Sequence, residues 1–345
     1  MAHIPQDVKG LSIVPSLANM LLSQGKVGDA YSWPLDDDLM ISVRTDRLSV
    51  YNFVLNCTVA RKGEVLTGLT HFFSRMLVEP MKIPHHLAIS KVSPGMNKIV
   101  DLLNIYPDID PRRTLAIKKC QILPFELIFR KHPGGSIWKE YLKSGMIAGK
   151  VFPPGMKKWQ RLDEVLFTPS TKGENDVNIT PAEFYEQTGD VGVQAETMSR
   201  WLFLAFYAFA AARGIVGLDS KFEVGVDSDG VLTLCDEWLT PDTTRLVMSD
   251  NLNESVEAGK EPEFADKQLV REFCATVPTP FKGDKGEYLI GFNNLDPTNS
   301  EHREFVHCFP IPENITRATS QSFQNVFRII TGLTLDDYQR EYLLP

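Results

Sequence analysis

The chain has 345 residues, of which 43% are hydrophobic and 23% are charged, an ordinary composition for a globular protein. This length predicts one or two domains with ample material for a core. The net charge of −8 argues against non-specific binding to nucleic acid or to an anionic membrane, because both depend on clustered cations. A local basic pocket for a phosphorylated small molecule remains compatible with this balance.

The cysteines and the chain start suggest a reducing compartment. The five cysteines are odd in number and contain no C-x-x-C pair, so neither a zinc ribbon nor a disulfide framework is predicted. No basic segment followed by an apolar one opens the chain. The longest apolar run, Trp201–Ala212, is too short to cross a bilayer and is interpreted as a core helix. We therefore expect a cytoplasmic protein.

The N-terminal third is predicted to be rich in strands. Leu39–Val43 and Ser49–Leu55 carry β-branched and apolar residues between turn formers, so each is expected to be one strand. Thr67–Leu77 has apolar residues at helical spacing and is expected to be a helix. Ala116–Phe129 is expected to hold two short strands broken at Pro124, which cannot donate to a ladder.

The rest of the chain mixes helices and strands. Lys150–Asn178 has no clear period, and so long an irregular stretch is usually functional or mobile. Pro181–Ala212 is expected to form two helices, and Thr316–Thr331 one amphipathic helix. Phe222–Val226 and Val231–Cys235 are expected to pair as a hairpin across an Asp-Gly turn. The predicted fold class is α+β, with two lobes.

Nine short segments occur in an order that is more specific than any one of them. They are Gly25–Asp29 (GKVGD), Thr45–Ser49 (TDRLS), Lys62–Leu66 (KGEVL), Arg130 with Gly135–Tyr141 (GSIWKEY), Phe167–Lys172 (FTPSTK), Asp176–Ile179 (DVNI), Asp219–Glu223 (DSKFE), Asp236–Glu237 with Thr240–Arg245 (TPDTTR), and Asp266–Gln268 with Arg271. Together they resemble the phosphoribosylaminoimidazole-succinocarboxamide synthase (SAICAR synthetase) family over roughly residues 20 to 345.

The resemblance implies a fold and an activity. The fold has an ATP-binding antiparallel β-lobe, which we place at residues 1–122, and a larger α/β lobe with the ribotide and metal site, at 123–345. The activity joins a carboxylated aminoimidazole ribotide to aspartate with ATP, giving the succinocarboxamide, ADP and phosphate. The expected partners are therefore small molecules. Two alternatives stay open: a paralogue that uses another amine or carboxylate, or a non-catalytic protein that binds nucleotide or ribotide.

Activation of a carboxylate by the ATP γ-phosphoryl group calls for Mg²⁺ and for acids that hold it. Glu223 and Asp236 lie on facing strands of the predicted hairpin, and the resemblance implies that they serve the metal. Asp176 could add a third oxygen. The alternative is two solvated acids on an exposed sheet face and a turn residue in a loop.

Lys221 and Asp219 are the predicted catalytic residues. Lys221 precedes Glu223 by two positions, so strand alternation puts both side chains on one face. A lysine beside metal-bound acids suits a phosphate or carboxyl oxygen, and Asp219 is placed to orient it. A simple ion pair is the competing interpretation.

Further residues are assigned to the substrates through the resemblance. Arg130, Ser136 and Arg245 match positions that hold the ribotide phosphate, and guanidinium is a bidentate phosphate donor. An arginine can equally be a surface residue. The matching motifs add Asp242, Asp46, Arg271 and Lys267 to the predicted substrate-binding set.

ATP is assigned to three residues. Lys26 would meet the phosphates from a turn that starts with glycine, although this is not a Walker sequence. Lys119 and Glu126 flank the predicted hinge between the lobes, where the adenine and ribose would lie.

Three positions depart from the family pattern. The family places a basic residue two positions after the lysine of its opening motif, where this chain has Gly28. Asn52 stands in place of an aspartate, and Val177 in place of a glutamate. Arg61 or Lys62 could replace the cation that is missing at position 28.

Overall fold

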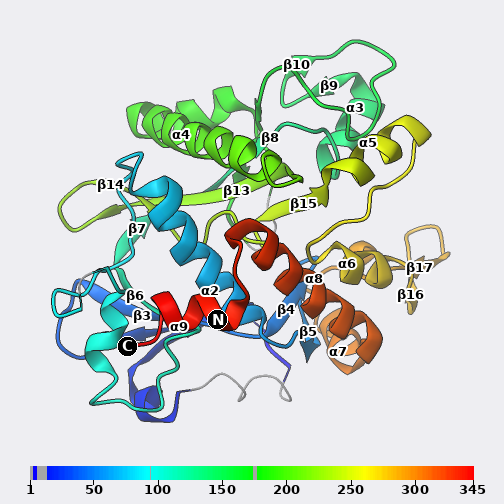
Figure 1. Ribbon diagram of the computed structural model, residues 1–345. Coiled ribbons are helices and arrows are strands. Elements are labelled where there is room, and N and C mark those ends of the chain that lie inside the picture. Colours follow the sequence, from blue (N-terminus) through cyan, green and yellow to red (C-terminus); the bar gives the residue numbers. More distant parts are fainter. Residues whose placement is uncertain (1–2, 6–13, 94, 174–176) are drawn as a thin grey trace. The chain divides into compact units, whose positions relative to one another are not determined.

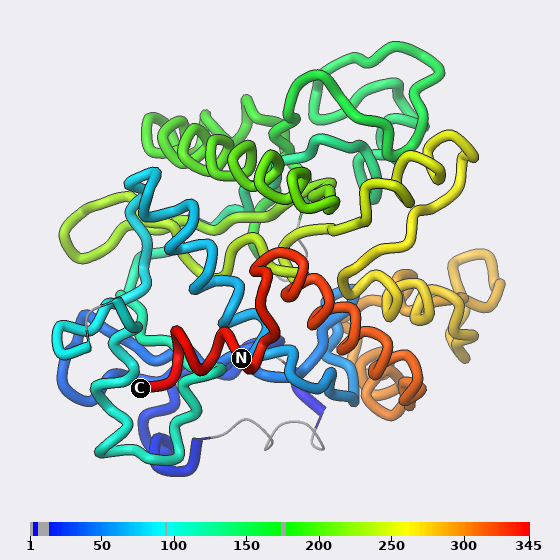
Figure 2. The backbone as a smooth tube through the Cα atoms, viewed as in Figure 1, coloured from blue at the N-terminus to red at the C-terminus, as the bar shows by residue number. Residues whose placement is uncertain are grey.

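The computed structural model describes residues 3–5, 14–93, 95–173 and 177–345. The chain divides into two compact units, which we call unit 1 and unit 2. Unit 1 is drawn from three segments, Met1–Gly68, Leu87–Lys118 and Lys267–Pro345, and unit 2 from Leu69–His86 and Lys119–Asp266. The segments of unit 1 are blue, cyan and gold to red in Figure 2. The functional lobes predicted at 1–122 and 123–345 stay a prediction, and the compact units follow other boundaries.

Unit 1 is built on an antiparallel four-stranded sheet in the order β1-β2-β3-β6. Its strands are β1 (Leu21–Gln24), β2 (Gly28–Ser32), β3 (Leu39–Arg44), β4 (Arg47–Val50), β5 (Phe53–Thr58), β6 (Thr114–Lys118), β16 (Pro278–Lys282) and β17 (Tyr288–Ile290). Its helices are η1 (Pro15–Met20), η3 (Lys98–Leu102), α6 (Gln268–Ala275), η4 (Phe292–Asn294), α7 (Ser300–Cys308), α8 (Glu313–Thr331) and α9 (Leu335–Tyr342). The helix α2 (Lys62–Phe73) begins in unit 1 and ends in unit 2.

Unit 2 is organised around one long strand. Its strands are β7 (Cys120–Ile122), β8 (Phe125–Arg130), β9 (Met146–Ile147), β10 (Lys150–Val151), β11 (Leu166–Phe167), β12 (Ser170–Thr171), β13 (Ile215–Asp227), β14 (Leu232–Cys235) and β15 (Thr244–Met248). Its helices are η2 (Ser74–Val78), α3 (Ser136–Ser144), α4 (Pro181–Ala211) and α5 (Ser249–Ala258). The strand β13 pairs antiparallel with β7, β8, β14 and β15, so residues distant in the sequence meet across it.

The helix α4 covers one face of this sheet (Figure 1). Phe203 and Phe206 of α4 are fully buried, and Phe203 stacks on Phe129 of β8 with ring centroids 6.3 Å apart. Phe129 also packs against Phe222 of β13, at 6.0 Å. Because neighbouring strand residues point to opposite faces, this apolar packing leaves the alternate residues of β8 and β13 for the other face.

Most predicted elements are confirmed, with one clear error. The hairpin of β13 and β14, the helices α2 and α8, and the break at Pro124 all form. The segment predicted as two helices is assigned as α4, with non-helical torsion angles at Gly189. The prediction of one strand at Ser49–Leu55 is wrong. Tyr51 and Asn52 both adopt positive φ, and the chain turns there between β4 and β5. Two-residue turns of this kind usually contain a glycine that marks them in the sequence, and this turn has none.

The mixed composition of helices and strands confirms the α+β class. Within the described ranges, no helix combines the length and the apolar composition needed to cross a bilayer. Trp201, in the apolar run of α4, is 60% exposed, whereas Leu202 is fully buried. The run therefore belongs to a surface helix and supplies both its packed side and part of its exposed side, so the expectation of a core helix holds only for the buried residues.

Candidate functional site

One face of β13 carries a row of charged residues. Asp219, Lys221 and Glu223 alternate along the strand, so their side chains share the face opposite to the phenylalanines beneath α4. The two neighbouring strands add Arg130 from β8 and Arg245 from β15, and both are direct register partners of Asp219. The sheet thus gathers five of the predicted residues.

The Asp219 carboxylate lies between two arginines. Arg130 Nη1 donates to Asp219 Oδ2 at 2.6 Å, and Arg245 Nη1 donates to the same oxygen. Arg130 is 5% exposed, and its Nε also donates to Thr168 Oγ1 at 2.8 Å. Burial lowers the pKa of the Arg130 guanidinium, and the negative charge of Asp219 opposes this effect. Asp219 therefore holds two buried or half-buried cations side by side.

Two glycines bring the start of α3 against Arg245. A Cβ on Gly135 would lie 2.9 Å from Arg245 Nη2, and Gly135 has a φ of 60°, which favours glycine. A Cβ on Gly134 would overlap the ring of Trp159, and Arg245 lies 5.8 Å from the centroid of that ring. Ser136 is exposed at the first position of α3, where backbone amide groups are available to an anion.

Further along the same face, lysines and glutamates alternate. Lys221 Nζ donates to Glu126 Oε1 at 2.8 Å and to Glu223 Oε1 at 3.2 Å. Lys172 Nζ donates to the other oxygen, Glu223 Oε2. Glu223 is only 4% exposed, and the two ammonium groups balance its buried charge. Ser170 Oγ adds a bond of 3.4 Å to Glu126 Oε2.

The protonation of Lys221 follows from these neighbours. Burial works against the charged form, but the carboxylates of Glu223, Glu126 and Asp236 outweigh it, so the pKa of Lys221 is raised. The ammonium therefore keeps its proton throughout the neutral range. Lys221 is suited to hold an anionic oxygen and unsuited to act as a base.

Asp236 and Asp242 lie beyond the end of β14. Asp236 directly follows Cys235, the register partner of Glu223, and has a φ of 59°. Its carboxylate is near enough to affect the pKa of Lys221. Asp242 lies half-buried in the turn before β15, and this turn is tied to β13 by a 2.9 Å bond from Lys221 N to Thr243 O.

The bonds of Asp219 given above join it to the two arginines, and those of Lys221 join it to Glu126 and Glu223, so we assign Asp219 to the arginine pair. Lys119 is half-buried where the chain enters unit 2 before β7. Asp176 lies outside the described residues.

The other predicted residues belong to unit 1. Lys26 is exposed in the turn between β1 and β2, and its Nζ donates to Asn52 Oδ1 at 2.8 Å. Asp46 accepts a bond of 2.9 Å from Gly63 N and lies 3.4 Å from Arg113 Nη2. Lys267 precedes α6 and Arg271 lies within it.

Besides Ser170, which binds Glu126, two residues of the polar face carried no assigned role at the level of sequence. Lys172 binds Glu223, and Thr168 binds Arg130. Both belong to the FTPSTK segment at Phe167–Lys172, so the motif itself was the available signal. Strand pattern could not identify them, because both lie just outside β11 and β12, which have only two residues each.

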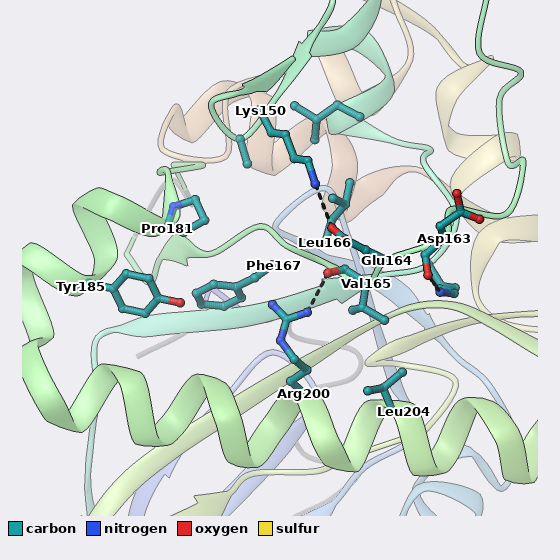
Figure 3. A pocket seen from close by; sticks show the side chains of 13 residues that line it. Lys150, Asp163, Glu164, Val165, Leu166, Phe167, Pro181, Tyr185, Arg200 and Leu204 are labelled. Atoms are coloured by element: carbon teal, nitrogen blue, oxygen red, sulfur yellow. Dashed lines mark hydrogen bonds and ion pairs between the residues drawn. The ribbon is translucent and has the colours of Figure 1, made fainter. Parts of the chain in front are cut away.

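A separate cavity of about 490 Å³ lies in unit 2 (Figure 3). Lys150 binds Glu164 at 2.9 Å and Arg200 Nη1 donates to Val165 O at 2.7 Å at its edges. None of the thirteen residues that line it is a predicted site residue. Lys131 faces this cavity whereas its neighbour Arg130 faces the charged row, as alternation along a strand requires.

Comparison with known proteins shows which family and which solved structures this chain is similar to. The sequence model of the SAICAR synthetase family matches residues 21–286. Phosphoribosylaminoimidazole-succinocarboxamide synthase of Maridesulfovibrio salexigens is 34% identical over 322 residues, which covers 92% of this chain and 95% of that protein. The enzyme of the same name from Chromobacterium violaceum is 36% identical over 253 residues, covering 72% and 84%. The structure of SAICAR-synthase from Saccharomyces cerevisiae complexed with SAICAR has a TM-score of 0.72 and 28% identity, and the match covers 95% of this chain and 97% of that one.

Proposed function

Because the chain belongs to the SAICAR synthetase family, we propose that it is an ATP-dependent carbon–nitrogen ligase of purine biosynthesis. It joins aspartate to the carboxylated aminoimidazole ribotide and releases SAICAR, ADP and phosphate. All five cysteines are free thiols, which supports a cytoplasmic location for this enzyme.

The observation that carries the proposal is the charged row on β13. Arg130 and Arg245 bind Asp219 from the two strands that flank β13, and Arg245 also lies against the start of α3. Two guanidinium groups and free backbone amides are the donors that a sugar phosphate needs. We assign the ribotide phosphate to Arg130, Arg245 and Ser136, with Asp219 as the residue that positions the arginines.

The second half of the row supports the transfer step. The ribotide carboxylate attacks the γ-phosphorus of ATP, the bond to ADP breaks, and an acyl phosphate forms. The aspartate amine then displaces phosphate and loses a proton. Lys221, which keeps its proton, holds negative oxygen during this transfer, and Glu126 and Glu223 fix its position.

Glu223 and Asp236 fit a magnesium–nucleotide complex better than a protein cage. Among the residues that the structure describes, no three His, Cys, Asp or Glu side chains form a group that could hold a metal ion. Mg²⁺ is usually held by one or two carboxylates together with substrate phosphates, and bound there it would neutralise phosphate charge. Both Glu223 oxygens are bonded to lysines, and Lys172 is the more exposed of the two, at 41% against 28% for Lys221. We therefore expect Mg²⁺ to displace the Lys172 ammonium group from Glu223 Oε2.

The activity is tested by ADP release. We expect release that requires both the carboxylated ribotide and aspartate. Release with another amine alone would identify the paralogue, and nucleotide binding by calorimetry without any turnover would identify the non-catalytic protein. Either result would overturn the proposed reaction.

Glu223→Gln tests the site itself. We expect turnover to fall by more than about a hundredfold, since the loss of a charge held for the transition state typically costs this much. Folding should persist, because the amide oxygen can still accept a bond from a lysine. Glu257→Gln, on the exposed side of α5, is the matched control and should leave turnover unchanged. Wild-type turnover in Glu223→Gln would remove Glu223 from the metal role.

A further inference from the structure

Two opposed residues in unit 1 share one space. Gly28 begins β2 and Arg44 ends β3, and they are direct register partners in the antiparallel sheet. Partners of this kind point their side chains to the same face. A Cβ on Gly28 would lie 3.6 Å from Arg44 Nη1 and 3.9 Å from Arg44 Cδ. The Arg44 side chain therefore lies against the place where a side chain of residue 28 would start, and the nearest atom to it is the backbone oxygen of Val43, at 3.2 Å.

The turn beside this pair presents a second cation. Gly25 N donates to Gly28 O at 2.7 Å, which closes the turn that carries Lys26. Lys26 Nζ donates to Asn52 Oδ1, an acceptor without charge, at 2.8 Å. Lys26 and Arg44 thus flank the start of β2.

The nearest carboxylate on β2 belongs to the other face. Asp29 follows Gly28, so its side chain points away from Arg44. It is bound there by Arg47, with Nη2 at 2.5 Å from Oδ1 and Nη1 at 3.3 Å from Oδ2, and neither side chain is more than 1% exposed. The charge of Asp29 is therefore already balanced by Arg47.

We propose that Arg44 is a nucleotide phosphate-binding residue that supplies, from β3, the positive charge absent from β2 at Gly28. This inference rests on the proposed use of ATP. Adjacent strands lie about 4.8 Å apart, so a long arginine can cover the same point from the neighbouring strand. Its planar guanidinium can bind phosphate oxygens in a bidentate manner. Gly28 is then the residue that leaves room for it.

Of the two cations suggested by the sequence, Arg61 is paired with carboxylates and the Lys62 side chain is buried. Arg61 Nη2 lies 2.8 Å from Glu64 Oε2 and 2.5 Å from Asp336 Oδ1. Lys62 is fully buried, with an exposed fraction of 0%. Arg44 is the residue whose guanidinium lies against Gly28.

The test measures ADP and adenosine binding to the full chain by calorimetry. Arg44→Met should weaken ADP binding about tenfold or more, since a charge-assisted hydrogen bond is lost. Adenosine has no phosphate, so its affinity should not change. Arg44→Lys should lose less than Arg44→Met, because it keeps the charge. Arg112→Met, which removes a surface arginine bound to Asp110, is the control and should bind ADP as the wild type does.

The exchange of the two residues provides the sharper result. The double variant Gly28→Arg with Arg44→Ala should recover ADP affinity to within about threefold of wild type, because the cation returns to the same space. Gly28→Arg alone should bring no gain, because Arg44 already supplies a cation there and a second guanidinium would be repelled by it. Unchanged ADP affinity in Arg44→Met, or an equal loss of adenosine affinity, overturns the role of Arg44. A wild-type chain that binds no ADP overturns the proposed function as well.

Discussion

At the scale of single residues, Asp219 is the point where charge is most concentrated. Its carboxylate accepts from Arg130 and Arg245 at a place where Arg130 is 5% exposed. Asp219→Asn should lower the free energy of unfolding by about 3 to 5 kcal/mol, because removing one charge of a buried ion pair leaves the other uncompensated. Urea unfolding followed by circular dichroism measures this.

The same variant reports on the phosphate site. Inorganic phosphate should recover part of the lost stability, since a dianion between two guanidinium groups replaces the carboxylate. Asp229→Asn, in the exposed turn after β13, is the control and should change stability by less than about 0.5 kcal/mol. If phosphate does not raise the free energy of unfolding of Asp219→Asn, that result would argue against an anion site at the arginines.

At the scale of elements, α3 has a glycine with positive φ at each end, but the two differ in ψ, at −133° for Gly135 and 9° for Gly145. Gly135 has a φ of 60° and Gly145 a φ of 70°. A Cβ on Gly135 would meet Arg245, whereas one on Gly145 would meet nothing within 4 Å. Alanine at Gly145 should cost about 1 kcal/mol of stability through the backbone alone, and alanine at Gly135 should cost more, because its ψ of −133° lies outside the left-handed helical region. Only Gly135→Ala should also raise the KM for the ribotide, by about tenfold, because it displaces Arg245.

The pair of variants separates backbone strain from site geometry. Thermal unfolding gives the stability of each, and initial rates give the KM. Equal KM values in the two variants would show that the start of α3 does not position Arg245 for substrate.

Strand periodicity was sufficient for part of this site. The spacing of Lys221 and Glu223 predicted that they share a face, and they are bonded at 3.2 Å. The pairing of Arg130 with Asp219 spans 89 positions, and register at that distance depends on the whole sheet. Arg44 carried no sequence signal either, because its importance lies in the glycine opposite. Local pattern predicts faces, whereas the neighbours across a sheet come from the tertiary fold.

At the scale of the whole molecule, two buried histidines predict acid sensitivity. His71 and His132 are 2% and 3% exposed, and burial lowers the pKa of each to about 4. Each imidazole has a pKa near 6.5 in the unfolded chain. Between pH 6.5 and 4 the unfolded chain therefore binds protons at these histidines that the native protein does not bind. Their stabilising contribution is complete above pH 6.5 and is lost as the pH falls towards 4, at up to about 1.4 kcal/mol per pH unit for each histidine.

The slope of unfolding free energy against pH between 4 and 6.5 measures this. His71→Leu and His132→Gln should each reduce the slope by the contribution of one titrating histidine. The double variant should show both reductions, since the two residues lie on different elements. A double variant with the wild-type slope would mean that other groups cause the acid sensitivity.

The interleaving of the two units has a consequence for synthesis on the ribosome. Unit 2 is complete once residue 266 has emerged, but unit 1 waits for Lys267–Pro345. Arg61 is paired with Asp336, and Gln339 Nε2 donates to Glu64 Oε2 at 2.8 Å, so residues separated by about 275 positions are bonded within unit 1. Unit 1 therefore stays incomplete until Lys267–Pro345 has been made, and a ribosome stalled before residue 267 would carry a folded unit 2 together with an unfinished unit 1 that is prone to aggregate.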